Sequence, residues 1–269
     1  MLKCGITGSS GNLGKNFLIT NKHFRYIKFK GDISNKKEVY YWIKKNEFDI
    51  LIHFAALVPT SKVNSNYKKA LITNVHGTKY LVDAILKFKK NINWIFFSST
   101  SHIYPFQKKK IKETFKPDPA SKYGKTKLVA ENYFRKKLEK ANINFCVGRI
   151  FSIFDNEGDD FLIPNLTRIF KNKQKNLVLE NLNHYRDFLS TKQISKVILF
   201  LWKKKYVGTI NIGSGVKTNL KSIAKIFANK AKKKVSFKFN KPTFHLADIS
   251  KLRKLGYKQS KLNIEGFFN

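Results

Sequence analysis

A tyrosine and a lysine four residues apart, Tyr123 and Lys127, have the types and spacing needed to move a proton. On a helix this spacing puts both side chains on one face, one turn apart. A nearby ammonium group favours phenolate, so it would lower the tyrosine pKa and make the pair a proton donor and acceptor near neutral pH. Tyr40 and Lys44 share the spacing without any accompanying motif, so the spacing alone does not decide.

Four consecutive hydroxyl side chains, residues 98–101, follow the apolar segment 92–97 and precede His102. Hydroxyl groups at the end of a buried strand can satisfy loose backbone groups, and they can also bind a substrate oxygen. The strand end alone is compatible with both roles.

Three glycines near the start of the chain, Gly8, Gly11 and Gly14, lie between a predicted strand and a predicted helix. In a dinucleotide-binding loop the first glycine makes the tight turn, and the second lets the backbone approach a pyrophosphate. The third lets the helix pack on the sheet, with its amides directed at the phosphates. This position, after the first strand of an alternating series, predicts a dinucleotide site.

The end of the second predicted strand bears on the choice between NAD and NADP. An acid usually binds the ribose 2′-hydroxyl there, and Asp32 comes slightly late for that role. Lys28 and Lys30 could instead meet a 2′-phosphate. The sequence therefore favours NADP, with NAD possible.

Short apolar segments alternate with helical patterns over the first 150 residues, which predicts a parallel sheet with right-handed crossovers. The fold class is α/β, a Rossmann-type doubly wound sheet with a small C-terminal substrate-binding lobe. We expect residues 1–154 and 184–213 to form the NAD(P)-binding domain, and residues 155–183 and 214–269 to form the lobe. The predicted strands are 3–7, 25–30, 49–54, 93–97, 144–149, 208–212 and 235–239, and the predicted helices are 12–20, 36–46, 67–89, 121–141, 197–202 and 220–231.

The chain carries 54 Lys and Arg against 17 Asp and Glu, a net charge of +37, and only six of these cations are Arg. Three explanations of this charge remain open. They are codon bias toward Lys, affinity for an anionic membrane or small anion, and nucleic-acid binding. The lysines are scattered and no nucleic-acid-binding module is present, which favours the first. We expect no dedicated nucleic-acid binding, although the positive field would attract an anionic substrate.

Cys4 and Cys146 both lie in apolar segments, which predicts free buried thiols and a cytoplasmic protein. No segment reaches the roughly 18 apolar residues of a membrane span. A fold that begins at residue 3 leaves no room for a signal peptide. The six histidines lack metal-ligand spacing, so no metal is expected.

Taken in order, the motifs resemble the extended short-chain dehydrogenase/reductases, the NAD(P)-dependent epimerase/dehydratase group that acts on nucleotide sugars. The resemblance covers nearly the whole chain. Its marks are Gly8-x-x-Gly11-x-x-Gly14, Gly31-Asp32-Ile33, His53-Phe54-Ala55-Ala56, Asn74-Val75-His76-Gly77-Thr78, Ser98-Ser99-Thr100 with Tyr104, Tyr123-x-x-x-Lys127, Arg149, Tyr185-Arg186-Asp187-Phe188 and Asn211-Ile212-Gly213-Ser214-Gly215.

The resemblance implies roles for single positions. Thr100 would hydrogen-bond the reacting oxygen of the sugar, and Tyr123 would pass the proton. Lys127 would hold the nicotinamide ribose, and Asn74 would support the network. The expected cofactor contacts are Gly8, Ser10, Gly11, Asn12, Leu13, Gly14, Asp32, Ile33, Phe54, Ala55, Ala56, Tyr123, Lys127 and Ile150, and the expected substrate contacts are Leu57, Thr100, His102, Ser152 and Arg186. Two of these residues have an alternative interpretation. Arg186 could instead form an ion pair with Asp187, and His102 could be a loop histidine that has no role in the site.

Departures from the family pattern narrow the activity. The family's 4,6-dehydratases follow the catalytic Thr with an Asp-Glu pair, whereas Ser101 and His102 follow Thr100 here. Dehydration needs those carboxyl groups, so it is not expected. Epimerases commonly have an Asn shortly after the arginine of the next strand, near the place that Ser152 occupies after Arg149.

The sequence therefore favours an NADP-dependent reductase of a nucleotide-linked 4-keto-6-deoxyhexose, with an NAD-dependent nucleotide-sugar 4-epimerase as the alternative. A third alternative is a redox-sensing or scaffold protein without chemistry, a class that usually lacks the Tyr or the Lys. The resemblance also implies a nucleotide-diphosphate sugar as substrate, a role in cell-surface polysaccharide biosynthesis, and a homodimer formed through segments 67–89 and 121–141.

Overall fold

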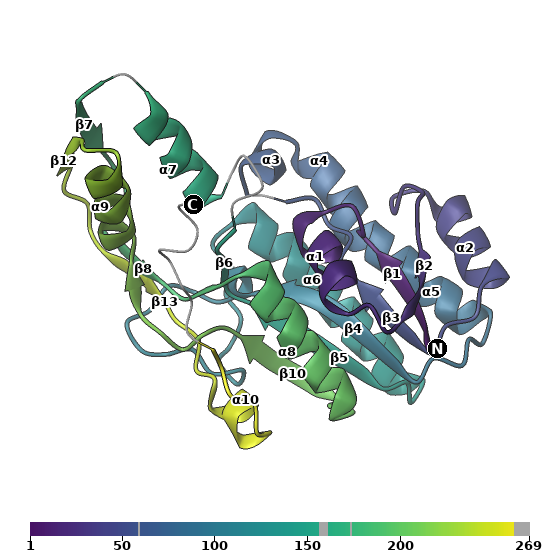
Figure 1. Ribbon diagram of the computed structural model, residues 1–269. Coiled ribbons are helices and arrows are strands. Elements are labelled where there is room, and N and C mark those ends of the chain that lie inside the picture. The colour runs from purple at the N-terminus through teal and green to yellow at the C-terminus, as the bar shows by residue number, and fades with distance from the viewer. Residues whose placement is uncertain (59, 156–160, 173, 261–269) are drawn as a thin grey trace.

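The main body of the protein is a parallel six-stranded sheet of order β10-β5-β4-β3-β1-β2 (Figure 1). The computed structural model describes residues 1–58, 60–155, 161–172 and 174–260. This sheet confirms the predicted Rossmann-type α/β class. Its strands are β1 (Lys3–Thr7), β2 (Arg25–Lys28), β3 (Ile50–His53), β4 (Trp94–Thr100), β5 (Phe145–Ile150) and β10 (Gly208–Ile212).

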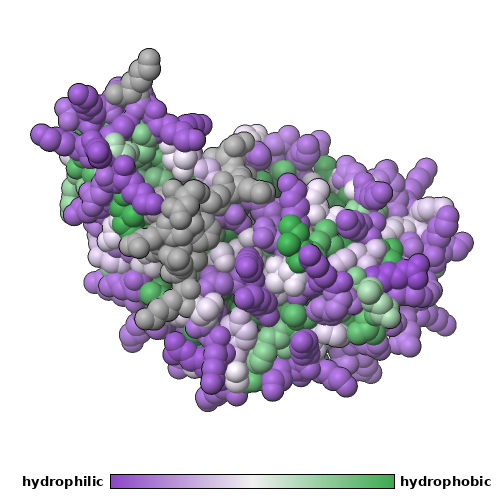
Figure 2. Space-filling model, in the orientation of Figure 1, coloured by the Kyte–Doolittle hydropathy of each residue, from purple (hydrophilic) through white to green (hydrophobic). Residues whose placement is uncertain are grey.

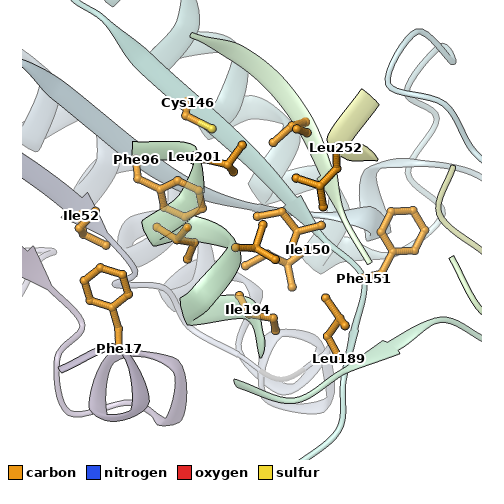
Figure 3. Packing of buried hydrophobic residues seen from close by; sticks show 14 of the residues in the cluster. Phe17, Ile52, Phe96, Cys146, Ile150, Phe151, Leu189, Ile194, Leu201 and Leu252 are labelled. Atoms are coloured by element: carbon orange, nitrogen blue, oxygen red, sulfur yellow. The ribbon is translucent and has the colours of Figure 1, made fainter. Parts of the chain in front are cut away.

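Helices cover both faces of the sheet because alternate residues of each strand point to opposite sides. Phe96 of β4 packs in one core cluster with Phe17 of α1 and Ile194 of α8 (Figure 3). Its neighbour Phe97 packs in a second cluster, with Phe134 of α6. The first face is covered by α1 (Asn12–Thr20) and α8 (Thr191–Lys203), and the second by α2 (Lys36–Lys45), α5 (Gly77–Lys87) and α6 (Lys122–Lys140).

The segment predicted as one helix over 67–89 is divided. It consists of α4 (Tyr67–Ala70), the π-helical turn η1 (Leu71–His76) and α5, preceded by α3 (Thr60–Ser65). A π turn widens a helix by one residue and often marks a functional site. Here the turn contains Asn74, whose side chain is buried.

A smaller unit is formed by segments that come before and after β10 in the chain. Its core includes Phe154, Leu166 and Phe227, and Figure 1 shows α7, α9, β7 and β12 together at one end of the molecule, away from the large sheet. The elements are α7 (Leu162–Lys171), β7 (Asn176–Leu179) paired with β12 (Lys234–Phe237), α9 (Leu220–Lys230), and a three-stranded sheet of β11 (Thr218–Asn219), β8 (His184–Arg186) and β13 (Thr243–His245). The remaining short elements are η2 (Ser101–Ile103), β6 (Ser152–Ile153), β9 (Phe188–Leu189) and α10 (Ser250–Lys254). Residues 156–160, 173 and 261–269 of the expected lobe lie outside the described residues.

The face shown in Figure 2 is covered mainly by hydrophilic residues, with scattered apolar ones between them. Cys4 and Cys146 are buried free thiols, and burial raises the pKa of both. Of the helices in the described ranges, none combines the length and apolar character needed to cross a bilayer. The described residues also contain no group of three or more metal-ligating side chains placed to hold a metal ion.

Candidate active site

Tyr123 is brought against the end of β4 by the way helix α6 begins. Ser121 caps the helix and accepts a hydrogen bond from the Gly124 backbone N–H at 3.0 Å. A Cβ on Gly124 would lie 2.2 Å from the His102 carbonyl oxygen, so only glycine allows this close approach. The Tyr123 ring then lies 5.6 Å from the His102 ring, and Thr100 hydrogen-bonds the phenol.

The phenol of Tyr123 is set up as an acid. Tyr123 is only partly exposed, and burial raises its pKa to about 12, while the hydrogen bond with Thr100 acts in the opposite direction. The depressed tyrosine pKa expected from the sequence is therefore not found. A group with this pKa stays protonated at neutral pH and gives its proton only to a strong base.

Lys127 is buried, with 3% of its surface exposed, one turn further along α6. Burial lowers its pKa to about 7, and the charge of Glu131 opposes this shift. The ammonium group lies 4.3 Å from the ring centroid of Phe97 in β4. Lys127 is therefore placed beneath the strand end that carries Thr100.

The sequence reasoning did not identify Glu131, which organises the side of the site below Lys127. Its carboxylate accepts a hydrogen bond from Ser99 and is bound by Arg149, with Nη2 at 2.6 Å and Nε at 3.1 Å. Arg149 also donates to the Tyr104 hydroxyl at 2.6 Å. The signal was present in the sequence, since Tyr123, Lys127 and Glu131 follow each other at four-residue spacing on one helical face.

Asn74 acts as a buried connector. Its Oδ1 accepts a hydrogen bond from the Leu57 backbone N–H at 2.6 Å, and its Nδ2 donates to Thr126 Oγ1 at 3.0 Å. The π turn thereby joins the loop after β3 to helix α6 beside Lys127. Asn74 therefore does not contact Tyr123 or Lys127 by a hydrogen bond in the described residues, but it bonds Thr126, which lies between them on α6.

The glycine loop has the shape of a cradle for phosphates. Gly8 has a φ of +71°, and a Cβ there would lie 2.6 Å from the Ala55 backbone nitrogen. A Cβ on Gly14 would lie 2.2 Å from the Gly8 carbonyl oxygen, whereas one on Gly11 would meet only that oxygen, at 3.6 Å. The loop is therefore closed against the protein at Gly8 and Gly14 and open at Gly11, which fits a dinucleotide pyrophosphate.

The other expected cofactor residues lie around this loop or near the strand ends beside it. Asp32 is exposed, and hydrogen bonds from the Ser34 side chain and backbone lower its pKa. Ile33 is 6% exposed and packs in the core with the helices of the second face. Ser10 lies in the turn between β1 and α1, and Asn12 and Leu13 begin α1. Phe54, Ala55 and Ala56 follow β3, and the buried Ile150 ends β5.

The expected substrate residues converge from the other side. Arg186 in β8 donates to Thr243, reaching the carbonyl oxygen at 3.2 Å and Oγ1 at 3.0 Å. The buried Asp187 accepts the backbone amides of Ser214 at 2.6 Å and Gly215 at 2.8 Å. Among the described residues Arg186 therefore does not form the ion pair with Asp187 that the sequence left open.

His102 and Ser152 complete the expected substrate residues. Burial lowers the pKa of His102, and the positive charge of Arg186 acts in the same direction. Ser152 is partly buried in β6, and its backbone N–H donates to the Asp187 carbonyl oxygen at 2.9 Å. His102 thus adjoins Tyr123 directly, while Ser152 is hydrogen-bonded to the residue that follows Arg186.

A family model described as "NAD dependent epimerase/dehydratase family" matches residues 6–213. The chain belongs to this family. It is 27% identical over 275 residues to a GDP-6-deoxy-D-talose 4-dehydrogenase of Aggregatibacter actinomycetemcomitans, and the match covers 98% of this chain and 92% of the relative. Membership of the NAD-dependent epimerase/dehydratase family makes the protein an enzyme.

Two solved structures have a similar fold. RMD from Pseudomonas aeruginosa, complexed with NADPH, superposes with a TM-score of 0.86 at 19% identity, covering 98% of this chain and 96% of RMD. The UDP-glucose 4-epimerase of Thermus thermophilus, in complex with NAD, gives a TM-score of 0.84 at 16% identity, covering 99% and 96%. At these identities the likeness concerns the fold.

Proposed function

We propose that this protein reduces the 4-keto group of a nucleotide-linked 4-keto-6-deoxyhexose, with NADPH as reductant and Tyr123 as proton donor. The observation that carries the proposal is the hydrogen bond that holds the Tyr123 phenol against Thr100 at the end of β4, and burial raises the pKa of this phenol so that it keeps its proton at neutral pH. Carbonyl reduction produces an alkoxide, which is basic enough to take this proton. Oxidation of a hydroxyl would instead need the phenolate.

The chain offers the parts that such a reaction needs. Thr100 would hydrogen-bond the carbonyl oxygen, and Tyr123 would deliver the proton to it. Lys127 would hold the nicotinamide ribose beneath β4. The open rim at Gly11 would hold the cofactor pyrophosphate, and the cofactor supplies hydride when bound.

Relatives support a nucleotide sugar and NADPH. The name of the Aggregatibacter relative, GDP-6-deoxy-D-talose 4-dehydrogenase, describes a redox reaction at position 4 of a GDP-linked deoxysugar. The structure of RMD was solved with NADPH. Lys28 and Lys30 are exposed near the end of β2, where they would meet a 2′-phosphate. Dehydration is not proposed, because Ser101 and His102 follow Thr100 and neither supplies a carboxyl group.

The test is to mix purified protein, NADPH and an enzymatically prepared 4-keto-6-deoxyhexose nucleotide and to follow the nicotinamide absorbance. We expect loss of NADPH in proportion to the sugar reduced. Tyr123→Phe should lower kcat by about 10²- to 10⁴-fold, because the proton donor is lost. The control is Tyr41→Phe, which removes the hydroxyl of a tyrosine that is 62% exposed on α2 and should leave kcat unchanged.

Two results would contradict the proposal. A Tyr123→Phe variant with the kcat of the unmodified enzyme would exclude Tyr123 as proton donor. An unmodified enzyme that consumes no NADPH with the 4-keto sugar, but inverts carbon 4 of a 4-hydroxy nucleotide sugar when NAD is supplied, would assign the site to a 4-epimerase instead.

A further inference from the structure

Strands β8 and β13 turn one set of side chains toward the candidate active site. They pair in parallel with His245 opposite Arg186 and Phe244 opposite Tyr185. Because side chains alternate along a strand, His245 and Arg186 share one face of this small sheet. Tyr185 and Phe244 share the other face, where their rings stack at 4.8 Å.

A continuous row of rings joins Tyr123 to Arg186. The His102 ring lies 5.6 Å from the Tyr123 ring and 6.0 Å from the His245 ring. The Phe106 ring lies 5.2 Å from His245, and the Arg186 guanidinium lies 4.9 Å from the Phe106 ring. His245 therefore stands midway between the proton donor and the arginine.

One of the two ring nitrogens of His245 has no hydrogen-bond partner among the described residues. Only 3% of the residue is exposed, and Nδ1 lies 3.4 Å from the Ser101 hydroxyl. Nε2 is buried and forms no hydrogen bond with any residue in the described ranges. A buried polar atom without a partner costs stability, and binding of a ligand is one reason for such an atom to be retained.

The charged surroundings of His245 favour an oxygen-rich, anionic ligand. The charged or titratable neighbours that affect it are His102 and Arg186, and no carboxylate among the described residues is one of them. Burial, followed by these two neighbours, lowers the His245 pKa to about 3, so the imidazole is neutral and keeps one N–H. Phe106, whose ring contacts that of His245, is 49% exposed.

We propose that Nε2 of His245 hydrogen-bonds the hexose of a nucleotide-diphosphate sugar, between the carbonyl end at Tyr123 and the diphosphate at Arg186. His245 is thereby a specificity-determining residue, which distinguishes the sugar-bearing ligand from the bare nucleoside diphosphate. Because Nε2 is buried, the half-exposed Phe106 ring moves aside when the hexose enters. This inference rests on the proposed function, since it assumes that the hexose lies along the row of rings.

The test compares calorimetric binding of GDP-mannose with that of GDP, in the presence of NADP⁺, for the unmodified protein, His245→Leu and His245→Gln. UDP-glucose and UDP form a second ligand pair. His245→Leu should weaken binding of the sugar-bearing ligand by about ten- to a hundredfold and leave the bare diphosphate unchanged. His245→Gln should recover part of the loss, because its amide nitrogen can stand near the place of Nε2.

Thermal unfolding separates this role from a structural one. His245→Leu removes the unpaired Nε2 but also the Nδ1 that faces the buried Ser101 hydroxyl at 3.4 Å, and these effects oppose each other, so its Tm should stay close to that of the unmodified protein. His23→Gln, at a histidine packed on Phe24 and Trp202, is the remote control and should change neither ligand's affinity.

The inference is overturned if His245→Leu binds the sugar-bearing ligand as well as the unmodified protein does. It is equally overturned if the variant loses affinity for both ligands in parallel with a lower Tm, because that pattern shows a structural role. An unmodified protein that binds neither ligand pair would instead contradict the proposed function itself, so the two failures are distinguishable.

Discussion

Two arginines lie on opposite sides of the Tyr123 region, and their surroundings differ in kind. Arg149 is 4% exposed. Burial acts to lower its pKa, but the hydrogen bonds and charges of Glu131 and Tyr104 together outweigh burial and raise it. Arg186 is partly buried, and burial alone lowers its pKa to about 10. One arginine is paired with a carboxylate, whereas the other faces two histidines and no carboxylate partner among the described residues.

This difference separates a part that holds the site from a part that receives a ligand. Glu131 and Arg149 satisfy each other and fix the end of β4 through Ser99. A buried pair of this kind is costly to break from one side. On the other side, Arg186 has a positive charge without a carboxylate partner among the described residues, and His245 has a ring nitrogen without a hydrogen bond there. An anionic substrate could bind both groups.

Removing one partner of the paired side should have the largest effect. Glu131→Ala leaves Arg149 buried without its carboxylate, so the free energy of unfolding should fall by about 3–5 kcal/mol. Urea denaturation followed by circular dichroism measures this change. The double variant Glu131→Leu with Arg149→Met removes both charges and should recover much of the loss. A single variant within about 1 kcal/mol of the unmodified protein would contradict the role of the pair.

Removing the arginine on the ligand side should affect binding more than folding. Arg186→Met should weaken GDP binding by about ten- to a hundredfold, because a charged hydrogen bond to the diphosphate contributes about 1.5–3 kcal/mol. Its free energy of unfolding should change less than that of Glu131→Ala. Calorimetric titration gives the affinity, and Arg168→Met, at an exposed arginine of α7, is the matched control. Unchanged GDP affinity in Arg186→Met would show that the diphosphate binds elsewhere.

The smallest expected effect is a pH dependence from Lys127. Its pKa in the folded protein is about 7, below the ordinary value of 10.5. Between these values the unfolded chain binds more protons, so the free energy of unfolding should rise with pH, by at most about 1.4 kcal/mol per pH unit. Urea denaturation between about pH 7 and about pH 9 should show this slope in the unmodified protein. If Lys127→Met shows the same slope, another group causes it.

The alternation of short apolar segments with helical patterns allowed the large sheet to be predicted, because its six strands have four to seven residues each and are separated by helices. The glycine loop and the Tyr123–Lys127 spacing were predictable for the same local reason. The π turn at Asn74 was not, since its apolar spacing also suits a continuous helix. Strands β8, β11 and β13 have two or three residues each, too few for any period. His245 could not be identified, because its position depends on a pairing with Arg186 across 59 residues.

The most direct test of the proposed reduction is to follow a deuterium label from the nicotinamide C4 of NADPH into the sugar. The labelled cofactor and the 4-keto-6-deoxyhexose nucleotide are incubated with the enzyme, and the product is examined by mass spectrometry and NMR. Reduction predicts one deuterium at carbon 4 of the product and an equal amount of oxidised cofactor. Recovery of the unreduced 4-keto sugar, with no deuterium incorporated and no cofactor consumed, would contradict the proposed reaction.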